Sequence, residues 1–131
     1  MRKLTTRFIK SQKGQSLVEF ALVLPVFILI FFGIMEVSRL WETANVLTSA
    51  AREGARAAAV TAPDVNRVQI AAQNILSAAN ISNATITVSG PNTSDEVIVT
   101  VSIYYTPITG SIIPGIGIFS ISRTTTMHWE G

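Results

Sequence analysis

The chain has 131 residues, of which 48% are hydrophobic and 14% are charged, and it contains no cysteine. An ordinary soluble domain carries about 25% charged residues, so this composition argues against a soluble enzyme and favours a small membrane-tethered protein. The absence of cysteine excludes a disulfide framework, a thiol nucleophile and a metal site with cysteine ligands.

Basic residues are concentrated at the N-terminus. Five of the ten Lys and Arg residues lie within residues 1–14, where there is no acidic residue. The rest of the chain holds five basic and eight acidic residues, a net charge of −3. Nucleic-acid binding needs basic residues spread over a folded surface. The overall charge of +2 comes from the N-terminal cluster and not from a folded basic surface, so we expect no nucleic-acid partner.

An apolar segment follows the basic cluster. Residues 20–35 contain no charged side chain, and extending the segment back to Leu17 gives 19 residues with the single carboxylate Glu19. A helix of that length spans about 28 Å, close to the ~30 Å hydrocarbon core of a bilayer. A cleaved secretory signal is disfavoured because the apolar run is long and no small-x-small cleavage site follows it. A buried core helix is disfavoured because so short a chain cannot enclose bulky side chains on every side. We therefore predict one membrane-spanning helix, with the basic N-terminus in the cytoplasm.

Helical periodicity continues past the apolar segment and predicts one helix over residues 16–60, half in lipid and half outside. The sequence Thr61–Asp64 interrupts the pattern, and a second helix is predicted over residues 63–79, with Pro63 and Asp64 in its first turn. The predicted apolar stripe of the exposed half consists of Val37, Leu40, Trp41, Ala44, Leu47, Ala51, Ala55 and Ala58.

The C-terminal part alternates between apolar and polar residues, as strands do. We predict strands over residues 84–89, 96–106 and 119–129, with a turn at 90–95 and an apolar loop at 110–117. The expected fold class is therefore α+β: a long N-terminal helix, a second helix and a small antiparallel sheet.

Residues that could carry catalysis are sparse. His128 is the only histidine, and no cysteine or carboxylate cluster accompanies it as a metal site. The sequence has no glycine-rich phosphate loop, and no serine or threonine has a credible base beside it. We expect no enzymatic activity, no metal and no cofactor.

A glycine and a glutamate mark the beginning of the apolar helix. Ser16 and Glu19 fit a capping box, in which Gly14 would lie in a loop. Alternatively, cleavage after Gly14 would create an α-amino group on Gln15, one helical turn from Glu19. An unpaired carboxylate in a membrane helix is costly, so this pair of opposite charges could align neighbouring subunits. Glu19 can serve both purposes.

The segment Ala51–Arg56 has the sequence Ala-Arg-Glu-Gly-Ala-Arg. Its charged residues could form a solvated face, with Glu53 and Arg56 paired at i, i+3. Gly54 costs up to ~1 kcal/mol relative to alanine inside a helix, which indicates a reason in packing. We predict that Gly54 packs against the chain's own sheet rather than against a neighbouring subunit.

The basic leader, Gly14 and Glu19 together resemble the processing signal of type IV prepilins. The motifs downstream keep the order and spacing of the TadE-like family, the pseudopilins (minor pilins) of the tight-adherence (Tad) pilus system, and the resemblance covers about residues 14–60. Phe20 follows the acid where the major pilins of this system favour tyrosine, which fits a minor component. The matching motifs are Gly14-Gln15-Ser16-Leu17-Val18-Glu19-Phe20-Ala21, Leu24-Pro25, Gly33-Ile34-Met35-Glu36, Arg39 and Ala51-Arg52-Glu53-Gly54-Ala55-Arg56.

The resemblance implies a domain organisation and a set of partners. Residues 1–14 would be a leader cut by a prepilin peptidase between Gly14 and Gln15, and Glu19 would set the register of assembly. Residues 15–60 would form the transmembrane and stalk helix, and residues 61–131 a small, pilin-like extracytoplasmic domain. The implied partners are the peptidase, other pilin or pseudopilin subunits, assembly proteins of the inner membrane, and the lipid bilayer. An uncleaved, signal-anchored envelope protein with an extracytoplasmic binding domain is the alternative.

Overall fold

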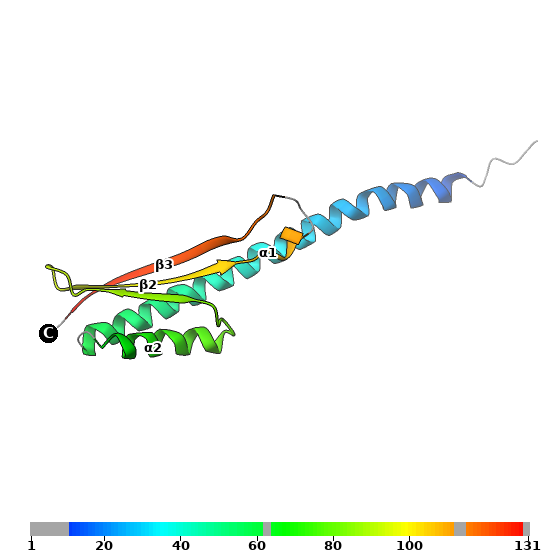
Figure 1. Cartoon of the computed structure of the whole chain (residues 1–131). Coiled ribbons are helices and arrows are strands. Elements are labelled where there is room, and N and C mark those ends of the chain that lie inside the picture. The colour runs from blue at the N-terminus through cyan, green and yellow to red at the C-terminus, as the bar shows by residue number, and fades with distance from the viewer. Residues whose placement is uncertain (1–10, 62–63, 112–114, 130–131) are drawn as a thin grey trace, which may run out of the picture. The chain divides into compact units, whose positions relative to one another are not determined.

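The computed structural model describes residues 11–61, 64–111 and 115–129, and the chain divides into two compact units, residues 1–35 and 36–131. The predicted α+β fold, with a long helix, a second helix and a three-stranded antiparallel sheet, is confirmed (Figure 1). The elements in chain order are α1 (Ser11–Thr61), α2 (Val65–Ala78), β1 (Thr85–Ser89), β2 (Glu96–Tyr105), the 3₁₀ helix η1 (Ile108–Ser111) and β3 (Phe119–His128).

The described part of the first unit is the N-terminal part of α1. Helix α1 begins at Ser11, so Gly14 and Ser16 lie inside it. The alternative in which Ser16 caps the helix and Gly14 lies in a loop is therefore wrong. One glycine costs only about 1 kcal/mol in a helix interior, and extending a formed helix by a few residues is far easier than nucleating one. The helix also continues through Pro25.

Helix α2 begins at Val65, two residues later than its sequence pattern suggested. Asp64 is its N-cap and not part of its first turn, and the Asp64 side chain accepts a hydrogen bond from the backbone N–H of Asn66 at 3.2 Å. This bond satisfies one of the donors that a helix start leaves without an intrahelical partner. Pro63 lies outside the described residues.

The sheet of the second unit has the order β1-β2-β3, with antiparallel neighbours. Ile86 of β1 is paired with Val101 of β2, and Ile103 of β2 is paired with Ile121 of β3. The predicted turn between β1 and β2 is stabilised by Asn92, whose side-chain oxygen accepts hydrogen bonds from the N–H groups of Ser94 and Glu96, both at 3.0 Å.

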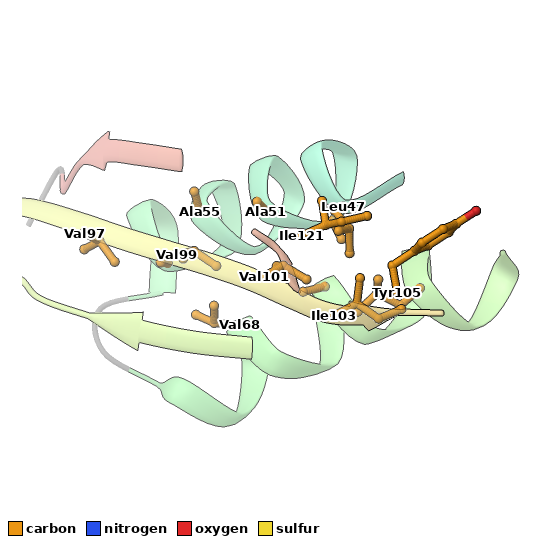
Figure 2. Close-up of a cluster of buried hydrophobic side chains, with 14 residues drawn as sticks. Leu47, Ala51, Ala55, Val68, Val97, Val99, Val101, Ile103, Tyr105 and Ile121 are labelled. Carbon is orange, nitrogen blue, oxygen red and sulfur yellow. The ribbon is translucent and has the colours of Figure 1, made fainter. Parts of the chain in front are cut away.

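The core lies between one face of the sheet and the two helices. Alternate side chains of β2 are buried, as expected of a strand with one covered face (Figure 2). Helix α2 contributes Val68, Ala72 and Leu76, while the face contributed by α1 consists mainly of alanine. The buried hydrophobic residues are Leu47, Ala50, Ala51, Ala55, Ala58, Val68, Ala72, Leu76, Val97, Val99, Val101, Ile103, Tyr105 and Ile121.

The predicted apolar stripe of α1 is only partly correct. Leu47, Ala51 and Ala55 are buried, but the side chains of Val37 and Trp41 are 65% and 72% exposed. The buried face is centred on the turn after Leu47, and Val37 and Trp41 lie to one side of it, where no described part of residues 36–131 covers them. Hydrophobicity identified these two residues as apolar, but only the placement of the sheet determines which side of the helix is covered.

Candidate functional site

The segment Gly14–Glu19 lies on an exposed stretch of α1. The side-chain amide of Gln15 donates a hydrogen bond to Glu19 at 3.3 Å. This contact shows that one helical turn brings position 15 within reach of the Glu19 carboxylate. A Cβ added at Gly14 would meet no atom within 4 Å, so the glycine is not required by packing inside the chain.

Gly14 is helical, contrary to the expectation of a flexible glycine ahead of the helix. A protease that cuts after Gly14 therefore needs the first turns of α1 to unwind. The ends of helices fray readily, and Gly14 lies three residues from the beginning of α1 at Ser11. The position of Gly14 is compatible with cleavage, although the helix includes it.

Apolar side chains on the N-terminal part of α1 remain exposed. Among the described residues, α1 is the one helix that is long and apolar enough to cross a membrane. Leu22, Phe27 and Ile34 are 71%, 67% and 63% exposed, so the described residues do not provide an apolar environment for them. Exposed hydrophobic surface on this scale marks contact with a membrane or with another protein. Helix α1 is therefore a candidate membrane anchor.

Glu36, the first charged residue after the apolar segment, has partners far along the chain. One oxygen of its carboxylate accepts a hydrogen bond from the Tyr105 hydroxyl at 2.7 Å. The other oxygen accepts from the backbone N–H of Ile108 at 3.1 Å. Glu36 thus joins α1 to the end of β2 and the beginning of η1.

These contacts shift the acidity of both side chains. The hydrogen bond from Tyr105 lowers the pKa of Glu36 below its ordinary value; partial burial opposes the shift, while the bond from Ile108 and the nearby charge of Arg39 assist it. Burial raises the pKa of Tyr105, and the hydrogen bond to Glu36 raises it further. Both shifts favour a charged carboxylate and a neutral phenol at neutral pH.

Sequence reasoning did not identify this role of Glu36. The Gly33–Glu36 motif contributed to the family resemblance, but the pattern contained no information on a tyrosine 69 positions away. The available signal was a carboxylate placed immediately after the apolar segment.

The segment Ala51–Arg56 separates into an exposed side and a buried side. Glu53 and Arg56 form the predicted i, i+3 ion pair at 2.9 Å, with side-chain exposures of 38% and 72%. Arg52 is also exposed, whereas Gly54 and Ala55 are buried.

Gly54 lies where α1 meets both the sheet and α2. A Cβ built on Gly54 would be 3.2 Å from Val99 Cγ1, 3.4 Å from Ala72 Cβ and 3.5 Å from Val68 Cγ1. The prediction that Gly54 packs against the chain's own sheet is confirmed, and α2 is a second neighbour that the sequence did not indicate. Gly54 has a packing role inside the chain's own fold.

His128 is exposed at the end of β3, in register with Glu96 of β2. Among residues 11–61, 64–111 and 115–129, no group of three or more His, Cys, Asp or Glu side chains is arranged to hold a metal ion.

Comparison with known proteins gives one family match. Residues 14–56 match the family model described as TadE-like protein. A search of curated proteins and a search of solved structures found no match to the chain. The matched segment begins at Gly14, contains Glu19 and Glu36, and ends at Arg56. The resemblance to the TadE-like proteins of the Tad pilus system is therefore confirmed over residues 14–56.

Proposed function

We propose that the chain is a pseudopilin, or minor pilin, that takes part in the biogenesis of a Tad-type pilus. The observation that carries this proposal is the TadE-like match, which begins at Gly14 and extends along α1 to Arg56. Gly14 lies in the first turns of α1, just ahead of the exposed apolar stretch of this helix, and Glu19 is the one carboxylate near the beginning of that stretch. These are the features that a prepilin peptidase substrate and a membrane-assembled subunit require.

In this proposal the protein is the substrate of an enzyme and has no catalytic activity of its own. The basic residues of positions 1–14 keep the N-terminus in the cytoplasm, and the apolar part of α1 spans the inner membrane. The peptidase cuts between Gly14 and Gln15. Residues 36–131 then lie outside the cytoplasm, where the subunit joins other pilins or pseudopilins and the assembly proteins of the inner membrane.

Glu19 has a role in assembly that begins with cleavage. The new α-amino group of Gln15 carries a positive charge one helical turn from Glu19, and the Gln15–Glu19 contact supports this spacing. In a medium of low dielectric constant, a carboxylate and an ammonium group stabilise each other strongly. The same carboxylate is available to the N-terminus of a neighbouring subunit, which would set the register between helices.

The N-terminus of the mature protein tests the proposal. We expect intact-mass analysis of the membrane-extracted protein to give a chain beginning at Gln15 in cells with the prepilin peptidase and at Met1 in cells without it. A Gly14→Ala variant is the matched control, because an alanine Cβ meets no atom and the fold is expected to be unchanged. Loss of cleavage in this variant would therefore report on recognition by the peptidase. A chain that keeps Met1 in cells with the peptidase would contradict the proposal and favour the uncleaved envelope protein.

Substitution Glu19→Gln tests the role of the carboxylate. We expect the variant to insert into the membrane and to be processed, but to be incorporated poorly, because the amide carries no charge to pair with an ammonium group. Co-purification with the other pilus subunits measures incorporation. Glu42→Gln on the exposed surface of the same helix is the matched control. Equal incorporation of the two variants would remove the proposed role of Glu19.

A further inference from the structure

Four apolar side chains near the connection between β2 and β3 are exposed. We call Ile108, Ile116, Ile118 and Phe119 the connection patch. Their exposed fractions are 48%, 40%, 66% and 41% respectively. Exposed apolar side chains that gather in one place mark a surface that is covered by a partner or a membrane.

The described parts of this connection lie together. Ile108, Ile116 and Ile118 line one shallow hollow of about 440 Å³. Gly110 allows the residues after β2 to approach the residues before β3 closely, since a Cβ added at Gly110 would be 2.7 Å from the carbonyl oxygen of Ile116. The ring centroids of Phe119 and Tyr105 are 5.4 Å apart, so Phe119 extends the patch to the end of β2.

Glu36 of α1 binds residues at and beside the connection patch. Its carboxylate binds the Tyr105 hydroxyl and the N–H of Ile108. Glu36 is joined by one peptide bond to Met35, the last residue of the apolar segment, and successive Cα atoms are about 3.8 Å apart. The patch is therefore held next to the residue at which the proposed membrane span ends.

The sequence around the patch is compatible with a lipid surface. Between Glu96 and Arg123 there is no Asp, Glu, Lys or Arg, so contact with lipid would bury no charged side chain of this stretch. The irregular backbone around the patch has polar groups that the hydrocarbon core cannot satisfy. These two facts together favour the headgroup region and its boundary with the acyl chains.

We propose that the connection patch docks on the outer surface of the bilayer and forms a second membrane contact of the subunit. This inference rests on the proposed membrane anchoring of α1. The apolar side chains enter the interface next to the end of the span, while Glu36 remains bonded to Tyr105 and Ile108. The domain is thus held at the membrane by two points instead of one.

Single-cysteine labelling tests the proposal, because the natural chain has no cysteine. The full chain, reconstituted in vesicles, carries an environment-sensitive fluorophore at one of three positions, introduced by Ile118→Cys, Ser94→Cys or Val26→Cys. Ser94 is an exposed control in the turn at the opposite end of β2, and Val26 lies in the apolar segment. Vesicles with lipids brominated near the headgroup or deep in the acyl chains, and iodide in the buffer, are the quenchers.

We expect the label at position 118 to lose fluorescence to the shallow brominated lipid more than to the deep one, and the label at 94 to respond to iodide alone. A label at 118 that responds to iodide as the label at 94 does would overturn the proposal. Protection at 118 from both brominated lipid and iodide would overturn it too, because it would indicate a protein partner. Quenching at 26 by the deep lipid tests the anchor separately, so a failure of the patch is distinguished from a failure of the span.

Discussion

At the scale of single residues, the contact between Glu36 and Tyr105 joins α1, at the position directly after the apolar segment, to the end of β2. The two side chains are 69 positions apart in sequence and 2.7 Å apart in the fold. A hydrogen bond to a charged group contributes about 1.5–3 kcal/mol to stability. For Glu36, which is partly exposed, solvent screening reduces this to about 1 kcal/mol.

Substitution Tyr105→Phe is expected to lower the free energy of unfolding by about 1 kcal/mol at pH 7, because it removes the hydroxyl and little else. The pKa of Glu36 is lower in the folded state, so its contribution is present above the ordinary value of 4.5 and is lost as the pH falls through the folded value. The difference between wild type and Tyr105→Phe should therefore shrink below about pH 4.5. Urea unfolding of the detergent-solubilised chain at pH 7 and at acidic pH measures this difference in the free energy of unfolding.

The neighbouring tyrosine provides the control for this experiment. Tyr104 is 70% exposed, and Tyr104→Phe should change stability little at either pH. A difference between wild type and Tyr105→Phe that is the same at both pH values would show that the hydroxyl acts independently of the Glu36 charge.

At the scale of elements, Gly54 sets how closely α1 approaches α2 and β2. Three side chains from these two elements lie within 3.5 Å of the position that a Cβ would occupy. An alanine gains up to about 1 kcal/mol of helix propensity but crowds Val99, so these two effects roughly cancel. A larger side chain has no such compensation.

We expect Gly54→Val to destabilise the domain by about 1–3 kcal/mol through overpacking. The loss should appear as a lower midpoint of urea unfolding, measured by circular dichroism. Ser49→Val, at an exposed position of the same helix, controls for the β-branched side chain and should stay within about 0.5 kcal/mol of wild type. Equal effects of the two substitutions would contradict the packing role of Gly54.

Much of this architecture could be predicted from the sequence because the elements have strong periodic patterns. The strand alternation located β1, β2 and β3 to within a residue at each end, and Gly54 indicated close packing. The exposure of Val37 and Trp41 could not be predicted, since it depends on where the sheet lies around α1. The contact of Glu36 with Tyr105 could not be predicted either, because it depends on where the end of β2 lies relative to α1 in the folded chain.

At the scale of the whole molecule, the buried core and the apolar segment belong to different compact units. All the buried hydrophobic residues of the described chain lie between Leu47 and Ile121. The division between the two compact units falls after Met35. The folding of residues 36–131 therefore depends on contacts that these residues provide themselves.

We expect the fragment of residues 36–131 to fold without the apolar segment and to unfold cooperatively on heating, as followed by circular dichroism. A fragment of residues 60–131 lacks the α1 residues that cover the sheet, including Leu47 and Ala51, and should show no cooperative transition. If the longer fragment also lacked a cooperative transition, the apolar segment would be needed for the fold of residues 36–131.

The opposite orientations within Ala51–Arg56 have a consequence for how the family motif is interpreted. Gly54 and Ala55 are buried in the fold, so substitutions there are limited by the chain's own interior. Arg52 and Arg56 are exposed, and the contact of Arg56 with Glu53 lies on the surface of α1, so the chain's interior does not limit these two positions. Adjacent positions of one short motif therefore tolerate different substitutions: added bulk is excluded at Gly54 and accommodated at Arg52.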